Sequence, residues 1–76
     1  MTQINQLALH SDEDFIELYK VLKVQGMSSA GGEAKHFIDE GQVTVNGEVE
    51  TRKRKKIVAG DIVSFNGESV QIIAAE

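Results

Sequence analysis

The chain has 76 residues, a formal net charge of −4, no cysteine, and a hydrophobic fraction of 41%. This length allows one small domain, and the hydrophobic fraction is that of a folded chain rather than a disordered one. The lack of cysteine excludes disulfides, thiol catalysis and cysteine-ligated metal sites. No apolar run reaches the ~18 residues of a membrane helix, and no signal-peptide pattern opens the chain. We therefore expect a soluble, cytoplasmic protein with no membrane partner.

The charge is distributed unevenly along the chain. Residues 1–19 contain four acidic residues and no basic one, whereas residues 20–56 contain all eight basic residues against five acidic ones. Residues 57–76 are acidic again. Exposed charges are screened beyond about 8 Å at physiological ionic strength, so local charge governs binding. The middle of the chain can therefore attract phosphate although the whole molecule is acidic.

A first helix is expected over residues 12–25, after a short strand or extended arm at residues 2–9. Ser11 is a candidate N-cap, and acidic residues follow it as in a capping box. Gly26 is suited to end the helix because glycine adopts a left-handed conformation without strain. The apolar stripe has the spacing i, i+3, i+4, i+7 and consists of Phe15, Leu18, Tyr19 and Leu22.

A second helix is expected to end at Gly41, so that the helical pair spans about residues 12–40. Ser28 or Ser29 can cap this helix, and its first turn contains Gly31 and Gly32. Its apolar face consists of Ala30, Ala34, Phe37 and Ile38. The N–H groups of such a helix start can bind an anion, but its glycines can equally serve close packing against the first helix. The sequence leaves both readings open.

From residue 42 onward the apolar residues alternate, as is typical of strands. Val43, Val45 and Val49 flank Asn46-Gly47, a strong hairpin signal because both central positions of a type I′ turn need positive φ. A second Asn-Gly pair lies at residues 66–67, between strands expected at 62–65 and 70–73. The order predicts an α+β fold in which two short packed helices cover a small antiparallel sheet over about residues 42–74. We expect residues 1–76 to form a single domain.

The most distinctive feature is the run of five basic residues at positions 52–56, directly after the first hairpin. Arginine presents a planar fork of donors to phosphate, and lysine acts as a point charge. A solvated loop, or lysines that protect a strand edge, would show the same pattern. The place after a hairpin and the contrast with an otherwise acidic chain favour a positioned phosphate-binding surface, which Lys35 can join.

Catalytic, metal and cofactor motifs are not apparent. His10 and His36 are far apart in sequence, and His36 is best interpreted as a surface histidine. The clustered acidic residues lie at expected helix ends, where capping and solvation explain them. No nucleophile motif is present, so we expect no enzyme activity. Three of the four aromatic residues lie on expected core faces, so a nucleic acid would be recognised by its backbone and shape rather than by base stacking.

Several stretches between Phe15 and Phe65 together resemble the αL RNA-binding domain, the module named after ribosomal protein S4 of the small subunit. Within that superfamily, Ser29–Lys35 and Glu50–Lys55 look most like the small stand-alone YbcJ-type proteins. The matching stretches are the helix with Leu18, Tyr19 and Leu22, the connection Gly26–Ser29, Glu33–Lys35 with Phe37 and Ile38, the hairpin Glu40–Gly47, and Ala59–Val63.

The resemblance implies an RNA surface formed by the helix pair and the beginning of the hairpin. Many members have an arginine where this chain has Gly31 or Gly32, which moves the contacts to backbone N–H groups and the basic run. The residues carried over by position are Lys23, Ser29, Lys35, Gln42 and Thr44, with Arg52, Lys53, Arg54 and Lys55 extending the patch.

The function expected from these features is non-catalytic binding of structured RNA, of the ribosomal or transfer type, through its phosphate backbone. We expect a monomer that needs no cofactor. The alternative is an adaptor that docks an acidic protein partner on the same basic surface, for example in ribosome assembly.

Overall fold

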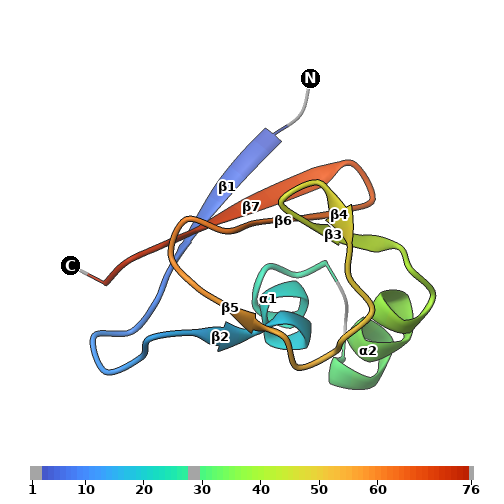
Figure 1. Ribbon diagram of the computed structural model, residues 1–76, viewed down its shortest axis with the longest axis horizontal. Coiled ribbons are helices and arrows are strands. Elements are labelled where there is room, and N and C mark those ends of the chain that lie inside the picture. Colours follow the sequence, from blue (N-terminus) through green and yellow to red (C-terminus); the bar gives the residue numbers. More distant parts are fainter. Residues whose placement is uncertain (1–2, 28–29, 76) are drawn as a thin grey trace.

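The computed structural model of the protein describes residues 3–27 and 30–75. Five strands form one sheet in the order β1-β7-β6-β3-β4, and β2 pairs with β5 in a separate two-stranded sheet. Both helices lie on one side of the larger sheet (Figure 1), which confirms the α+β prediction. The elements are β1 (Gln3–Ala8), β2 (Ile16–Glu17), α1 (Leu18–Val24), α2 (Gly31–Asp39), β3 (Val43–Val45), β4 (Glu48–Val49), β5 (Lys56–Ile57), β6 (Ile62–Phe65) and β7 (Glu68–Ile73).

The N-terminal segment forms a full strand of the larger sheet. β1 pairs with β7 in parallel, whereas the pairs β3–β4, β3–β6 and β6–β7 are antiparallel. Parallel neighbours need a long crossover connection, and here the helix layer and the other strands of the sheet lie between β1 and β7 in the chain. The sequence predicted an antiparallel sheet. The observed sheet is mostly antiparallel, and the β1–β7 pair is the parallel exception.

Both Asn-Gly hairpins are confirmed by their backbone angles. The φ angles are 53° and 85° at Asn46 and Gly47, and 54° and 80° at Asn66 and Gly67. All four are positive, as a type I′ turn requires. The side chain of Asn46 also joins its turn to the β5–β6 connection, because its Nδ2 donates to Asp61 Oδ1 (3.0 Å) and its Oδ1 accepts from Ile62 N (2.9 Å).

The predicted start of the first helix is wrong: α1 begins at Leu18, not at residue 12. Ser11 does not cap it, and Phe15 precedes it as a 38% exposed side chain. Glu13 closes a local turn instead, since its N–H donates to His10 O (2.9 Å) and its Oε1 accepts from His10 N (3.1 Å). Ile16–Glu17 then form β2, so a tertiary strand pairing prevails over the local capping pattern.

The helix ends agree with the sequence. Gly26 and Gly41 have φ angles of 72° and 76° and follow α1 and α2 directly after one capping residue. In each case the glycine N–H and the next N–H return to helix carbonyls, which is a Schellman ending. Ala30 is the N-cap of α2 and is exposed. The prediction that Ala30 belongs to the apolar face of this helix is therefore wrong. The serines predicted as caps, Ser28 and Ser29, lie outside the described residues.

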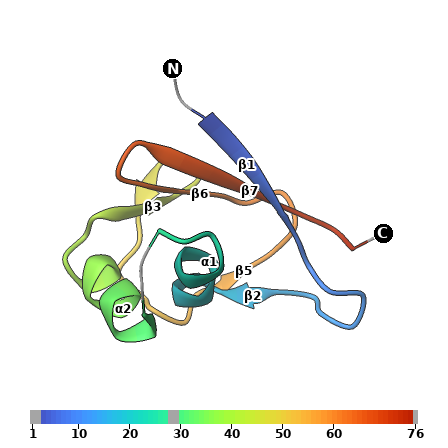
Figure 2. The same ribbon diagram turned by 180° about the vertical axis from the view of Figure 1, so that it is seen from behind.

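The core fills the space between the larger sheet and the helix pair. α1 lies between α2 and the β2–β5 pair (Figure 2), and its inner residues are fully buried. The stacked rings of Phe37 and Phe65, 4.7 Å between centroids, close the α2 end of this core. The fully buried large side chains are Leu18, Val21, Leu22, Ile38, Val43, Ile57, Val63, Val70 and Ile72.

Candidate nucleic-acid interface

The loop between β4 and β5 carries the basic run and lies against the start of α1. We call residues 51–56 the basic loop. The N–H groups of Leu18 and Tyr19 donate to the carbonyls of Lys55 (3.0 Å) and Lys53 (3.1 Å). At its end the loop enters β5, where Glu17 faces Lys56 in the β2–β5 register. The basic loop is therefore held by backbone contacts that do not depend on its side chains, and it uses donors that a helix start leaves open.

Glu50 organises the first arginine of the basic loop. Its Oε2 accepts from the backbone N (3.1 Å) and Nε (2.9 Å) of Arg52, and its Oε1 accepts from Arg52 Nη2 (3.1 Å). Lys55 Nζ lies 4.0 Å from the same Oε1. The Glu50 side chain is only 13% exposed. Its hydrogen bonds with Arg52 lower the pKa of Glu50 from 4.5 to about 2, and in turn raise the pKa of Arg52. This carboxylate stays ionised and fixes the direction of the Arg52 fork.

Two other carboxylates face the basic loop at longer distances. Arg54 Nε lies 3.7 Å from Glu17 Oε2, and Lys53 Nζ lies 4.0 Å from Asp39 Oδ1 at the end of α2. The Lys53 and Arg54 side chains are 45% and 73% exposed. Exposed ion pairs of this kind contribute only about 0–1 kcal/mol. A phosphate group can therefore compete for both cations, while their resting positions are already set.

The helix pair adds three more cations, the helix-pair lysines Lys20, Lys23 and Lys35. Lys35 Nζ lies 4.7 Å from the centroid of the Tyr19 ring and Lys20 Nζ lies 5.9 Å from it, so one half-buried aromatic ring joins the two helices. Lys20 also pairs with Glu17 at 3.4 Å, the carboxylate that faces Arg54. Glu17 therefore links Lys20 of the helix pair to Arg54 of the basic loop, and the Tyr19 ring links Lys20 to Lys35.

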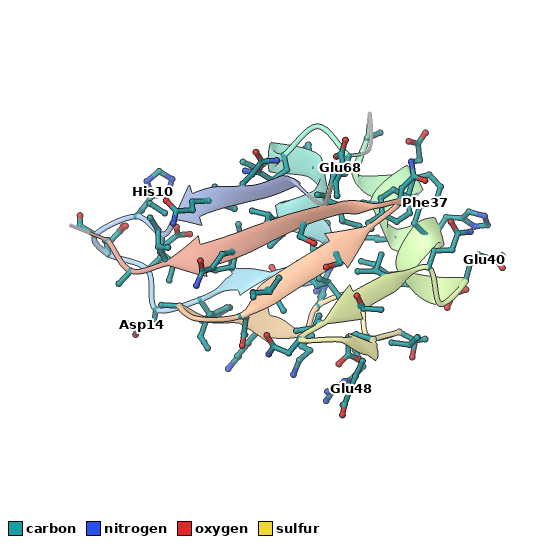
Figure 3. All side chains as sticks on the ribbon, turned by 90° about the horizontal axis from the view of Figure 1, so that it is seen from above. His10, Asp14, Phe37, Glu40, Glu48 and Glu68 are labelled. Atoms are coloured by element: carbon teal, nitrogen blue, oxygen red, sulfur yellow. The ribbon has the colours of Figure 1, made fainter. Side chains whose placement is uncertain are left out.

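The predicted site residues divide between two sides of the molecule. Lys23 and Lys35 lie on the helices, and Gln42 is exposed in the turn that follows α2. Thr44 lies between the buried Val43 and Val45 and opposite Ser64, so its side chain is on the outer face of the sheet. Figure 3 looks onto that face, with the helices behind the strands. Ser29 lies outside the described residues. The structure thus brings together the lysines and the basic loop, and separates Thr44 from them.

Tyr19 and Lys20 were not among the predicted site residues. Tyr19 was assigned to the apolar stripe, yet it is only half-buried and contacts two ammonium groups. The sequence could have indicated Lys20 as a site residue, because Lys20 and Lys23 are three residues apart and therefore share a helix face. What the sequence could not show is that Lys35 of the second helix reaches the same ring.

The described part of the chain contains neither a candidate metal site nor a candidate membrane span. No group of three or more histidine, cysteine or acidic residues there could hold a metal ion. No helix within residues 3–27 and 30–75 is long and apolar enough to cross a membrane.

The chain belongs to the S4 domain family, whose model matches residues 9–73. It is similar to the Escherichia coli (strain K12) protein named "Putative RNA-binding protein YbcJ", with 59% identity over 59 residues that cover 78% of this chain and 84% of the relative. It is also 38% identical, over 74% of this chain and 79% of the relative, to the "Probable ribosome maturation protein RlbA" of Bacillus subtilis (strain 168).

Solved structures agree with the fold. The solution structure of YbcJ from E. coli, described as revealing an αL motif involved in RNA binding, matches with a TM-score of 0.72 and 50% identity over 97% of this chain and 92% of that chain. The 30S ribosomal protein S4e from Thermoplasma acidophilum matches with a TM-score of 0.64 over 76% of this chain and 31% of that chain. That protein is 24% identical and supports the fold alone. The predicted αL motif and YbcJ-type family are thereby confirmed.

Proposed function

We propose that this protein is a non-catalytic, cytoplasmic RNA-binding protein that holds the phosphate backbone of structured RNA, of the ribosomal or transfer type. The observation that carries the proposal is the basic loop, whose backbone is fixed on α1 while its arginines remain more than 70% exposed. Membership of the S4 domain family and the name of the YbcJ relative support the same function. The RNA surface consists of Lys20, Lys23, Lys35, Arg52, Lys53, Arg54 and Lys55, with Gln42 at its margin.

Phosphate binding follows from how these cations are held. Arg52 is oriented by Glu50, so little side-chain entropy is lost when its exposed edge meets a phosphate. On binding, Lys53 and Arg54 exchange long ion pairs with carboxylates for ion pairs with phosphates, whose oxygens can accept two parallel hydrogen bonds from an arginine fork. If about four phosphates are neutralised, the logarithm of the association constant should fall with the logarithm of salt concentration with a slope of about −3.

The test is a charge-matched pair of double variants. Lys53→Gln/Arg54→Gln removes two positive charges from the basic loop but keeps the carbonyl that accepts from Tyr19 N. Gln6→Glu/Asn66→Asp gives the same net charge at exposed positions of β1 and the β6–β7 turn. Fluorescence anisotropy with a labelled RNA hairpin should show the salt slope reduced by about 1.5 in the first variant and unchanged in the second. Equal slopes in the two variants would contradict the proposal.

A protein-binding adaptor remains the alternative, since the same exposed cations can dock an acidic protein. Nuclease treatment before a pull-down separates the two functions. A partner held through RNA is lost, and a partner that binds this surface directly is retained.

A further inference from the structure

A hollow of about 450 Å³ lies beside α1, next to the helix-pair lysines. Its lining comes from α1, from β2 and from the turn at residues 10–13. That turn is fixed by the two hydrogen bonds between His10 and Glu13. The volume is within the range of small-molecule sites in proteins, about 300–1,000 Å³. The hollow is lined by His10, Glu13, Ile16, Tyr19, Lys20, Lys23 and Val24.

The lining combines apolar walls with positive charge. Tyr19 and Ile16 are half-buried, and Val24 is 59% exposed at the end of α1. Lys20 and Lys23 lie on the same helix, so their ammonium groups border these walls. A ligand that fits this lining has a flat apolar part and a negatively charged part. A nucleotide has both, in its base and its phosphate.

We propose that the hollow binds one unpaired nucleotide of the RNA, with its base against Tyr19 and Val24 and its phosphate on Lys20 and Lys23. This inference rests on the proposed function and assigns one contact within it. The Glu13 carboxylate offers a hydrogen-bond acceptor at the rim for an amino group of the base. Base–aromatic contacts tolerate any base, because every base has a π face.

Lys20, which lines the hollow, is linked to Arg54 of the basic loop through Glu17. Glu17 lies within 3.4 Å of Lys20 and 3.7 Å of Arg54, so the two cations flank one carboxylate. An RNA backbone that crosses Arg54 and Lys20 brings a neighbouring nucleotide to the hollow. A paired stem keeps its bases inside the duplex, whereas a bulged nucleotide can turn outward onto a side chain. The protein should therefore prefer a stem with an unpaired nucleotide over a fully paired stem.

Tyr19 supplies a direct signal for this contact, because the chain has one tyrosine and no tryptophan. Two RNA hairpins serve as probes, one with a single unpaired adenosine in its stem and one with that nucleotide deleted. Binding of the bulged hairpin should quench the tyrosine emission, and binding of the paired hairpin should change it much less. The bulged hairpin should also bind about fivefold tighter or more, in line with measured base–aromatic stacking.

The matched variants are Val24→Glu and Val58→Glu, which have the same net charge. Val24 lines the hollow, whereas Val58 is 44% exposed and contributes nothing to its lining. Both valines are exposed, so both variants should fold, which circular dichroism checks. Val24→Glu should lose the preference for the bulged hairpin and the quenching, and Val58→Glu should keep both.

The outcomes separate this inference from the proposed function. If wild type binds both hairpins equally and with equal emission, or if Val24→Glu keeps the preference, the nucleotide contact is wrong while RNA binding stands. If anisotropy shows no binding of either hairpin at low salt, the proposed function and this inference are both overturned.

Discussion

The two layers of this small domain differ in their content of basic residues. We call α1, α2 and the basic loop the helix layer, and the five-stranded sheet the sheet layer. All eight basic residues lie on α1, on α2 or in the segment from Arg52 to Lys56, and no strand of the five-stranded sheet contains lysine or arginine. The outer face of the sheet instead presents uncharged side chains such as Thr44, Ser64 and Gln71. A net charge of −4 therefore coexists with a concentration of all eight basic residues outside the five-stranded sheet. Segregation of charge, rather than its sum, decides which partner the chain can bind.

The largest expected effect comes from moving positive charge between the two layers. Lys53→Gln/Arg54→Gln should weaken RNA binding about tenfold or more at low salt, since two phosphate contacts are lost. Adding Gln6→Lys and Glu68→Gln restores the net charge, but on the strands of the sheet. Binding measured by anisotropy should not recover in this quadruple variant. Recovery to the wild-type affinity would show that net charge alone governs binding.

A smaller effect is expected from Glu50, which orients a cation of the helix layer. Glu50→Gln raises the net charge by one, yet it should weaken RNA binding about threefold, because Arg52 then loses more side-chain freedom on binding. It should also lower the urea midpoint of unfolding slightly, because the hydrogen bonds of the Glu50 carboxylate to Arg52 are weakened. Urea denaturation and anisotropy measure the two changes.

The control for Glu50→Gln is Glu48→Gln, the same change two residues earlier in the exposed β4 strand. This variant should leave stability unchanged and leave affinity unchanged or slightly higher. Tighter RNA binding by Glu50→Gln than by Glu48→Gln would mean that Glu50 acts only as a repelling charge.

The same ion pair predicts a pH dependence of stability. The pKa of Glu50 falls from 4.5 to about 2 on folding, so the native state favours the ionised carboxyl. Its contribution is fully present above about pH 5 and is lost as the pH falls through 4 toward 2. The difference in urea midpoint between wild type and Glu50→Gln should therefore shrink over this interval. A difference that stays constant down to pH 2 would contradict the lowered pKa.

The smallest expected effect is at Thr44, which the family resemblance assigned to the RNA surface. Because its side chain lies on the sheet layer, Thr44→Ala should leave RNA affinity unchanged within about twofold, the size of a neutral surface substitution. Lys35→Ala, on the helix layer, serves as comparison and should weaken binding and reduce the salt slope by about 1. A loss at Thr44 equal to that at Lys35 would mean that RNA contacts both layers.

The sequence predicted those parts of the fold that local chemistry determines. The Asn46-Gly47 hairpin and the ends of both helices depend on residues that adopt positive φ, and such residues are visible in the chain itself. The predicted start of α1 was wrong because the first N–H groups of this helix donate to the carbonyls of Lys53 and Lys55, more than thirty residues away in the chain. No local pattern contains that contact.

The candidate site was predictable to the same extent. The basic run and Lys35 stood out by charge, but their relation to one another depends on Tyr19 and Glu17, which each contact cations from different parts of the chain. The basic run alone was ambiguous between a solvated loop and a binding surface. In the structure, backbone hydrogen bonds to α1 fix the position of the loop, and Glu50 orients Arg52. The basic loop therefore has a defined conformation.

The most direct test of the division between the layers is a titration of ¹⁵N-labelled protein with a short RNA hairpin, followed by NMR. The amide signals of α1, α2 and the basic loop should shift, and those of Thr44, Ser64 and Gln71 should stay in place. This result would place RNA on the helix layer. Shifts concentrated on the outer face of the sheet, with the basic loop unaffected, would contradict the proposed RNA surface.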